Sequence, residues 1–356
     1  MKIYAGFDSG GTSTRCLIAD ETGRPLGYGK GGPSNYLFCG RELAAASIRQ
    51  SLREALSQAS TRIKVTPPLA GIFIASAAVE VFGGSSHAEF FKEVTGCDRI
   101  ECDSDIFPVW FAAGKPRFAP AICTIAGTGA VTYLLSGHRF VKSSGWGPLF
   151  GDEGSGYDIG QKALQLVSRM SDGRASLITQ DEQAFYEAVL EHYQVPLEHP
   201  RRLLRAVNRS SAAEGEAADD GLGSDYRSRA ASVTRTVDAL AQEDNQTAMA
   251  LFETAAEDIA RSVRAVILRS AHEDPYDYTE NDSGESFPLV LSGGLFREES
   301  PLTRALKKAL SGEERLTGIC LPSVPAVQSA ACIALYQAGL EEAAEKLYAS
   351  SFSAIG

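Results

Sequence analysis

The feature that most constrains the fold is a pair of glycines between two short, alternating segments near the start of the chain. Apolar residues at positions 3, 5 and 7 alternate with other residues before Asp-Ser-Gly-Gly-Thr at 8–12, and the alternation resumes over 14–20. This pattern predicts a β-hairpin. Glycines at its tip can take positive φ and bring backbone amides close to phosphate oxygens, and Asp8 could hold a hydrated Mg²⁺. An ordinary Gly-Gly hairpin turn is the alternative.

Two more glycine clusters follow predicted strands. The Gly-Thr-Gly turn at 127–129 lies between two predicted strands, and the Gly-Gly pair at 293–294 follows a buried strand at 289–291. Glycines at this last position would let the chain pass close beneath an adenine and its ribose. The repeated order of strand, turn and strand indicates an internal duplication.

The rest of the chain alternates strands with helical patterns, which predicts an α/β layer fold. A length of 356 residues suggests about two domains. Helices are predicted at 41–60, 86–95, 155–171, 181–194, 199–208, 226–242, 245–272 and 299–311, with two more near the end of the chain, and solvated loops at 210–224 and 276–286.

Two common phosphate-binding motifs are excluded. The chain has no Gly-x4-Gly-Lys-Ser/Thr loop. Residues 27–32 match G-x-G-x-x-G, but residues 33–35 (Pro-Ser-Asn) do not open the helix that a dinucleotide site requires.

Composition narrows the range of possible binding partners and cell compartments. The net charge of −11 argues against a nucleic-acid surface, and no apolar run is long enough to span a membrane. The first residues reach Asp8 too early for a secretory signal, and the seven scattered cysteines are typical of reduced thiols, so we expect a cytoplasmic protein. No histidine or cysteine spacing indicates a metal site.

The most distinctive segment is Gly-Trp-Gly-Pro-Leu-Phe-Gly-Asp-Glu-Gly-Ser-Gly at 145–156. Glycines flanking Trp146 allow a tight backbone path, and the carboxylates of Asp152 and Glu153 can accept hydrogen bonds from hydroxyl groups. The alternative is that Asp152 caps a helix N-terminus.

The ordered glycine clusters resemble the sugar kinase, actin and heat-shock chaperone superfamily. The segment at 145–156 resembles the signature of the BadF/BadG/BcrA/BcrD ATPase family, and within it the N-acetylglucosamine kinases. The resemblance implies two actin-like (ribonuclease H-like) ATPase domains with an interdomain cleft. It places the first domain at 1–115, joined by the C-terminal helix at about 340–356, and a larger second domain with a helical insertion at 116–339.

The resemblance also implies an ATP-dependent kinase that phosphorylates an amino sugar, with N-acetylglucosamine 6-phosphate as the expected product. ATP and Mg²⁺ would bind at Asp8, Gly10, Gly11, Thr12, Gly127, Thr128, Gly129, Gly293 and Gly294, with Asp8 reaching the metal through water. The sugar would contact Asn35, Gly145, Trp146 and Asp152. Turn chemistry after Pro33 is the alternative for Asn35.

The general base is assigned by resemblance to Asp105, with Asp103 as a competitor two residues away. The family shows Asn-Asp-Ala here, whereas this chain has Ser at 104 and Ile at 106. A second departure is Gln328-Ser329, which stands where the family has Gly-Ala and predicts looser packing of that helix.

Three other functions stay open at this stage. The chain could phosphorylate glucosamine or another hexose, act as an ATPase that activates a radical enzyme through an iron–sulfur cluster, or be a sugar sensor without turnover. Expected partners are ATP and a small amino sugar, with no nucleic acid and no membrane, and the resemblance also implies a homodimer.

Overall fold

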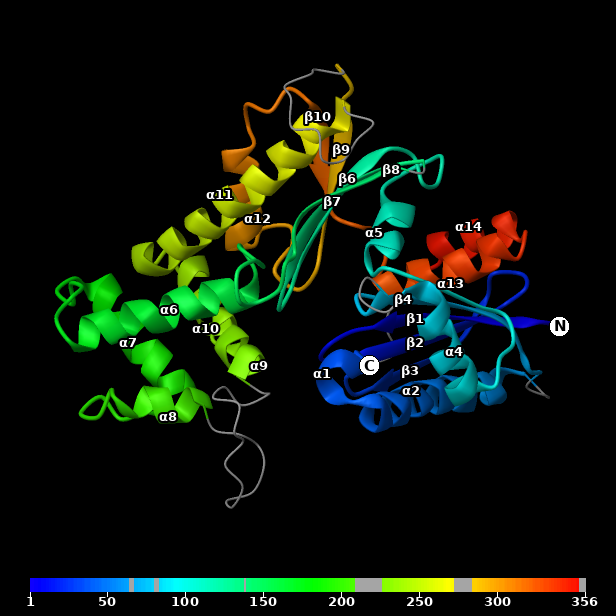
Figure 1. Cartoon of the computed structure of the whole chain (residues 1–356), viewed down its shortest axis with the longest axis horizontal. Coiled ribbons are helices and arrows are strands. Elements are labelled where there is room, and N and C mark those ends of the chain that lie inside the picture. Colours follow the sequence, from blue (N-terminus) through cyan, green and yellow to red (C-terminus); the bar gives the residue numbers. More distant parts are fainter. Residues whose placement is uncertain (64–66, 80–82, 138, 209–225, 272–283, 352–356) are drawn as a thin grey trace. The chain divides into compact units, whose positions relative to one another are not determined.

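The computed structural model describes the chain except for residues 64–66, 80–82, 138, 209–225, 272–283 and 352–356 (Figure 1). The chain divides into two compact units, Met1–Ala119 with Pro322–Gly356 and Pro120–Leu321, called here unit 1 and unit 2. The predicted loop at 210–224 and most of the one at 276–286 lie outside the described residues. No helix among the described residues is long and apolar enough to cross a membrane.

Unit 1 is a five-stranded sheet with helices on both faces. Its strands are β1 (Ile3–Ser9), β2 (Thr14–Asp20), β3 (Pro25–Gly31), β4 (Leu69–Ser76) and β5 (Ile100–Asp103), in the order β3-β2-β1-β4-β5. The predicted hairpin is confirmed as β1 and β2, and β4 and β5 run parallel to β1. Helices α2 (Arg41–Arg62) and α4 (Gly84–Thr95) cover one face, and α5 (Ile106–Ala112), α13 (Ala326–Gln337) and α14 (Glu341–Ala349) the other (Figure 1).

The glycine-rich stretch at 27–32 is a packing surface for α2. A Cβ on Gly27 would lie 2.0 Å from the Ala55 carbonyl oxygen, and one on Gly29 would lie 1.9 Å from the Ser51 carbonyl oxygen. A Cβ on Gly31 would clash with the backbone of α2 in the same way. Because alternate residues of a strand share one face, the glycines at 27, 29 and 31 let the helix backbone lie directly on β3.

The chain returns to unit 1 at Pro322, earlier than the predicted return near residue 340. The reason is that α13 packs on β1: a Cβ on Gly6 would lie 2.0 Å from the Ala331 amide nitrogen, so the helix rests on the strand backbone. The Gln328 amide is buried and donates to the carbonyls of Leu347 and Ser350, at 2.7 and 3.1 Å. Gln328 therefore joins α13 to the end of α14, and the expected loosening of this helix is not seen.

Arg117 joins the segment after α5 to α14. Its side chain is 5% exposed, donates to both carboxylate oxygens of Glu345 at 2.6 and 2.9 Å, and lies 3.8 Å from the centre of the Tyr348 ring. The hydrogen bonds from Arg117, helped by Lys115, lower the pKa of Glu345 to about 2. The folded state therefore favours the charged form of Glu345.

Glu345→Gln is expected to lower the stability of unit 1 at neutral pH by about 1–2 kcal/mol, because Arg117 loses its counter-charge. A lowered folded-state pKa contributes stability that is present above the unfolded value of 4.5 and is lost as the pH falls towards about 2. Thermal unfolding midpoints of wild type and variant should thus differ at pH 7 and converge near pH 2. Glu342→Gln, at an exposed position of the same helix, is the control. A gap that persists at low pH would contradict this account.

Unit 2 repeats the sheet of unit 1 and adds a helical region. Its strands are β6 (Ala121–Ala126), β7 (Ala130–Ser136), β8 (Arg139–Ser144), β9 (Phe287–Ser292) and β10 (Leu316–Cys320), in the order β10-β9-β6-β7-β8. Read from β8, this is the strand order of unit 1, as expected from an internal duplication, although the sequence did not reveal β8. The helices are α6 (Gly156–Ser171), α7 (Gln180–His192), α8 (Arg202–Asn208), α9 (Tyr226–Ser232), α10 (Thr234–Gln242), α11 (Gln246–Leu268) and α12 (Pro301–Ala309).

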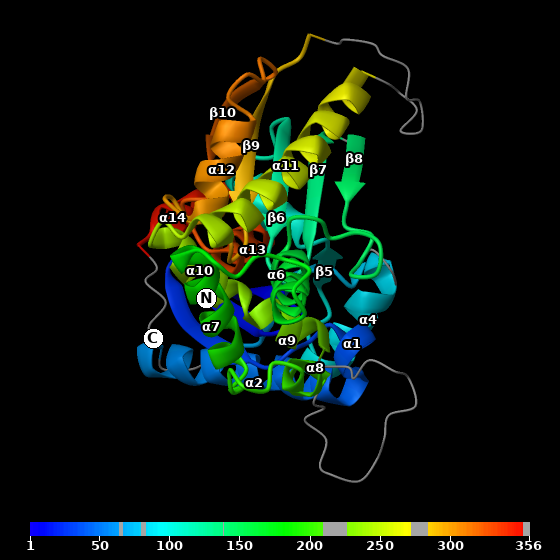
Figure 2. The ribbon, with the colours of Figure 1, turned by 90° about the vertical axis from the view of Figure 1, so that its left-hand side faces the viewer.

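The core of unit 2 lies between its sheet and its helices. Helix α11 lies across β6, β7 and β8, and α6, α7 and α10 pack against α11 (Figure 2). The helix predicted at 226–242 is interrupted at Val233. The carbonyl of Arg229 accepts from the hydroxyls of Ser232 and Tyr193, both at 2.7 Å, and these bonds compete with helix continuation.

Candidate active site

Three acidic residues of unit 1, Asp8, Asp103 and Asp105, lie at the same end of its sheet. Since β1, β4 and β5 are parallel, their carboxyl ends lie together, and the register pairs Asp8 with Ala75 and Ala75 with Asp103. Asp8 and Asp103 are two strands apart, about 10 Å at the usual strand spacing. Asp105 follows two residues later, directly before α5. The sheet thus brings together the predicted magnesium residue and both candidates for the base.

Asp8 is paired with a cation from the neighbouring strand. Arg15 Nη1 lies 2.8 Å from Asp8 Oδ2, and the carboxylate keeps a side-chain exposure of 21%. Burial raises the pKa of Asp8, and the Arg15 guanidinium opposes that rise. Arg15 was not among the residues predicted from the sequence, although it directly opposes Asp8 in the hairpin.

The hairpin tip differs in one respect from the expectation. Neither Gly10 nor Gly11 has positive φ. A Cβ on Gly10 would lie 3.0 Å from the Ser13 carbonyl oxygen, and one on Gly11 would meet open space. The two glycines therefore matter because they leave the backbone of the hairpin tip uncovered by side chains. Thr12, which follows them, is exposed.

Asn35 is held close to this tip. The Ser34 amide donates to the Gly10 carbonyl at 3.1 Å, and the Ser34 hydroxyl lies 2.7 Å from that of Ser9 and 2.6 Å from that of Thr14. Asn35 is buried, and its carbonyl accepts from the amide of Cys39 in the short helix α1 (Tyr36–Cys39). The structure therefore unites two predicted groups of unit 1, the hairpin glycines and the Ser-Asn pair.

Ser104 contacts both candidate bases. Its amide donates to Asp103 Oδ1 at 2.8 Å, and its hydroxyl donates to Asp105 Oδ1 at 3.3 Å. Burial raises the pKa of Asp103. One oxygen of Asp103 is thus occupied by the backbone at the end of β5.

In unit 2, the glycine turns converge at the carboxyl ends of β6 and β9, which are parallel neighbours. The Gly127 carbonyl accepts from the Gly156 amide at 2.8 Å, so the turn at 127–129 is hydrogen-bonded to the first residue of α6. Gly293 has a φ of +106°, and a Cβ there would lie 2.3 Å from the Ala126 carbonyl oxygen. Position 293 therefore requires glycine, because its φ is positive and there is no room for a Cβ. A Cβ on Gly294 would meet open space.

Asp152 lies directly beside this turn. It is 4% exposed, has a φ of +58°, and accepts from the backbone amides of Ala130 and Gly147. A Cβ on Gly129 would lie 2.9 Å from Asp152 Oδ2. The residue that caps α6 is Ser155, whose hydroxyl accepts from the Asp158 amide at 3.1 Å, so the capping alternative for Asp152 is wrong.

Arg227, from α9, completes the surroundings of Asp152. Its Nη2 lies 2.6 Å from Asp152 Oδ2. Burial raises the pKa of Asp152, while Arg227 and the two amides lower it. Arg227 was not predicted from the sequence, because it lies 75 residues after Asp152 and belongs to no local motif.

The loop before Asp152 exposes large apolar side chains. Trp146, Leu149 and Phe150 are 75%, 80% and 73% exposed. Gly145, with a φ of +72°, begins the loop, and a Cβ on Gly151 would lie 2.7 Å from the Trp146 Cβ. The backbone around Trp146 is therefore tight, as expected, while its indole faces away from the protein core.

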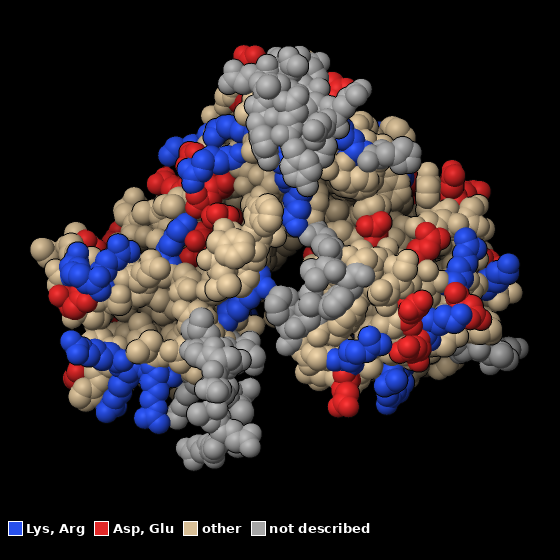
Figure 3. Space-filling model, in the orientation of Figure 1, with Lys and Arg blue, Asp and Glu red and all other residues tan. Residues whose placement is uncertain are grey.

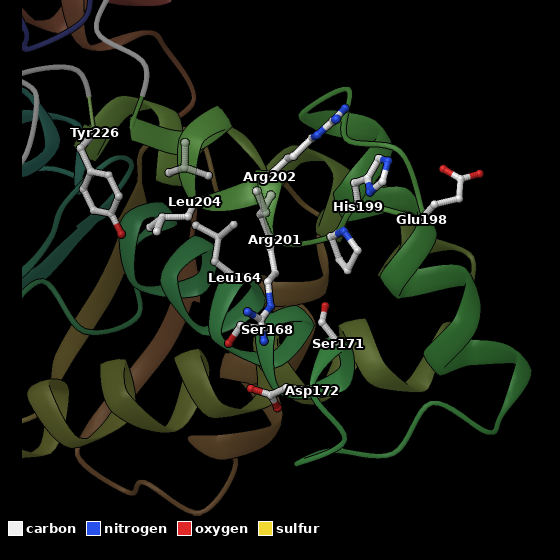
Figure 4. A pocket seen from close by; sticks show the side chains of 13 residues that line it. Leu164, Ser168, Ser171, Asp172, Glu198, His199, Arg201, Arg202, Leu204 and Tyr226 are labelled. Carbon is white, nitrogen blue, oxygen red and sulfur yellow. The ribbon is translucent and has the colours of Figure 1, made fainter.

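A cavity of about 740 Å³ lies elsewhere in unit 2, between α6 and α8 (Figure 4). Leu164, Leu203 and Val207 line it, with Arg201 and Asp172 at its polar side. Lys and Arg side chains gather over this α7–α8 end of the unit (Figure 3). The cavity contains none of the predicted site residues and is not part of the candidate site.

A sequence profile of the BadF/BadG/BcrA/BcrD ATPase family matches residues 5–334. The chain belongs to this family. Curated relatives include an N-acetylmuramic acid/N-acetylglucosamine kinase of Clostridium acetobutylicum, 25% identical over 75% of this chain and 80% of the relative. A glucosamine kinase of Vibrio cholerae is 28% identical over 49% of this chain and 57% of the relative.

A solved structure of a candidate N-acetylglucosamine kinase from Chromobacterium violaceum matches with a TM-score of 0.67 and 24% identity, covering 94% of this chain and 99% of that one. This likeness supports the fold. The α/β class with two actin-like domains, implied by the sequence resemblance to the BadF/BadG/BcrA/BcrD ATPase family, is confirmed.

Proposed function

We propose that this protein is an ATP-dependent kinase that transfers the γ-phosphoryl group of ATP to a hydroxyl of an amino sugar, with N-acetylglucosamine as the preferred acceptor and its 6-phosphate as the product. The observation that carries the proposal is the Asp152 carboxylate, held by backbone amides beside the glycine turn at 127–129 and the first residue of α6. The curated relatives support the class of acceptor, since the name of each includes an amino sugar.

Residues that bind ATP and the sugar are proposed in unit 1 and in unit 2. The phosphates of ATP are assigned to the glycine tip at 10–12 and the turn at 127–129, and the adenosine to 293–294. The first residue of α6 lies at the turn, and the N-terminus of a helix carries partial positive charge that favours phosphate. Sugar hydroxyls are assigned to Asn35 and Asp152, and the ring to the tight loop at Gly145 and Trp146.

Mg²⁺ is assigned to Asp8. Its carboxylate is partly exposed at the sheet edge, and one oxygen is paired with Arg15, so the fit is to a hydrated ion reached through water. When bound with ATP, Mg²⁺ neutralises charge on the phosphates. Asp105 is proposed to accept the proton of the attacking hydroxyl, because it lies at the same sheet edge as Asp8.

A coupled ADP-release assay with ATP and Mg²⁺ tests this function. The acceptors are N-acetylglucosamine, N-acetylmuramic acid, glucosamine, N-acetylmannosamine and glucose, with a sugar-free blank. We expect strong ADP release with N-acetylglucosamine, a low blank, and a product whose phosphorus nucleus couples to the C6 protons. Equal ADP release with and without sugar would instead favour an ATPase. Binding of sugar without any turnover would favour a sensor.

A further inference from the structure

The Asp152 carboxylate is surrounded by donors from three segments of unit 2. The amides of Ala130 and Gly147 and the guanidinium of Arg227 all donate to it, and the Asp152 side chain is only 6% exposed. A carboxylate has about four acceptor positions. Among the described residues three groups donate to Asp152, which leaves one acceptor position for a hydroxyl group.

Backbone packing determines where Arg227 lies. A Cβ on Gly160 of α6 would lie 1.9 Å from the Ala230 carbonyl oxygen of α9, so the two helices touch through their backbones. The Tyr226 hydroxyl donates to Gln161 Oε1 at 2.9 Å, which anchors the start of α9 on α6. The Arg227 side chain therefore extends from a fixed point, and its own exposure is 28%.

The charge of Arg227 offsets the cost of burying Asp152. A buried carboxylate without a counter-charge tends to take up a proton, and a protonated carboxyl loses acceptor capacity. Among the neighbouring acidic groups, Glu153 is exposed, and Asp158 on α6 is paired with Lys162 at 2.7 Å. Arg227 is the charged group that acts on Asp152 within the described part of unit 2.

We propose that Arg227 is a positioning residue of the sugar site, which holds one oxygen of Asp152 so that the remaining acceptor position faces a sugar hydroxyl. This inference rests on the proposed kinase function. It assigns Arg227 no contact with the sugar itself. Its effect is expected in sugar affinity, since a correctly held acceptor is needed both before and during the reaction.

Arg227→Met keeps the apolar stem and removes the charge. We expect the KM for N-acetylglucosamine to rise about 10- to 100-fold, as for a lost charge-assisted hydrogen bond, with kcat and the KM for ATP within about threefold of wild type. The acidic limb of kcat/KM for the sugar should move to higher pH, because Asp152 then protonates more readily. Arg227→Lys should restore part of the affinity. Unchanged sugar KM and pH profile would overturn the proposal.

Two further variants separate positioning from general loosening of α9. Arg229→Met removes the other arginine of α9, whose guanidinium donates to the Ala206 carbonyl at 2.8 Å. This variant should leave the sugar KM near that of wild type. Asp152→Asn should itself raise the sugar KM, and adding Arg227→Met to it should cost little more. Strictly additive effects, or an equal loss in Arg229→Met, would count against the proposed role.

Carbon-13 NMR of aspartate-labelled protein distinguishes failure of this inference from failure of the kinase function. The Asp152 carboxyl signal is identified by its loss in Asp152→Asn, and its titration should move to higher pH in Arg227→Met. The same titration in both proteins would overturn the role of Arg227, whatever the substrate is. Wild-type protein without turnover on any sugar, but with the shifted titration in Arg227→Met, would overturn only the kinase function.

Discussion

Replacing Asp105 by Asn is expected to lower kcat for the amino sugar by about two to four orders of magnitude, the range usual for loss of a general base. Asparagine keeps the shape of the side chain and its hydrogen bonding to Ser104 but cannot accept the hydroxyl proton. The KM for the sugar should change little, because the base acts in the transition state. Steady-state ADP release at saturating ATP and Mg²⁺ measures both constants.

Asp103→Asn is the matched control for this experiment. Asp103 is two residues away, and its Oδ1 already accepts from the Ser104 amide. We therefore expect Asp103→Asn to reduce kcat by less than about tenfold, in line with a neighbouring charge that does not transfer the proton. If the large loss occurs in Asp103→Asn and Asp105→Asn retains full activity, the base is Asp103.

Replacing Gly29 by Ala is expected to cost unit 1 about 3 kcal/mol or more, the upper end of the range for an overpacked core. The new Cβ would lie 1.9 Å from the Ser51 carbonyl oxygen, and both atoms belong to backbone-fixed positions, so α2 must move away from β3. For a domain of this size the thermal midpoint should fall by roughly 6–12 °C. Differential scanning calorimetry of the intact chain measures it.

Gly318→Ala is the control for Gly29→Ala. Gly318 lies on the edge strand β10, where a Cβ would meet open space. Its midpoint should stay within about 2 °C of wild type, as for an exposed substitution without a clash. Equal effects of the two alanines would mean that the contact with α2 does not decide the stability of β3.

Much of the fold could be predicted because its signals are local. A period of two on either side of a Gly-Gly turn predicted β1 and β2, and the helical patterns predicted α2, α6 and α11 to within a few residues. These patterns depend on side chains close together in the chain. Neither β8 nor the break in 226–242 was predicted, because contacts with other segments determine both.

The candidate site was predictable as separate motifs but not as an arrangement. The sequence shows glycines at 127–129 and Asp152 in a glycine-rich segment, yet only the fold places Asp152 over Gly129. Gly27 and Gly29 illustrate the reverse case: they matched a nucleotide motif, and their role is to admit α2. A glycine motif cannot be read without its context, because glycine serves close packing and ligand approach equally well.

By itself, the sequence determined the strand-and-turn order that marks an actin-like fold, the family signature at 145–156, and the carboxylates available for chemistry. The tertiary structure alone decided that Asp8 pairs with Arg15, that α13 returns to unit 1, and that Arg227 holds Asp152. The physical reason is the separation of the interacting residues along the chain. Strands and turns depend on residues a few positions apart. An ion pair between residues 75 positions apart exists only once packed helices bring its partners together.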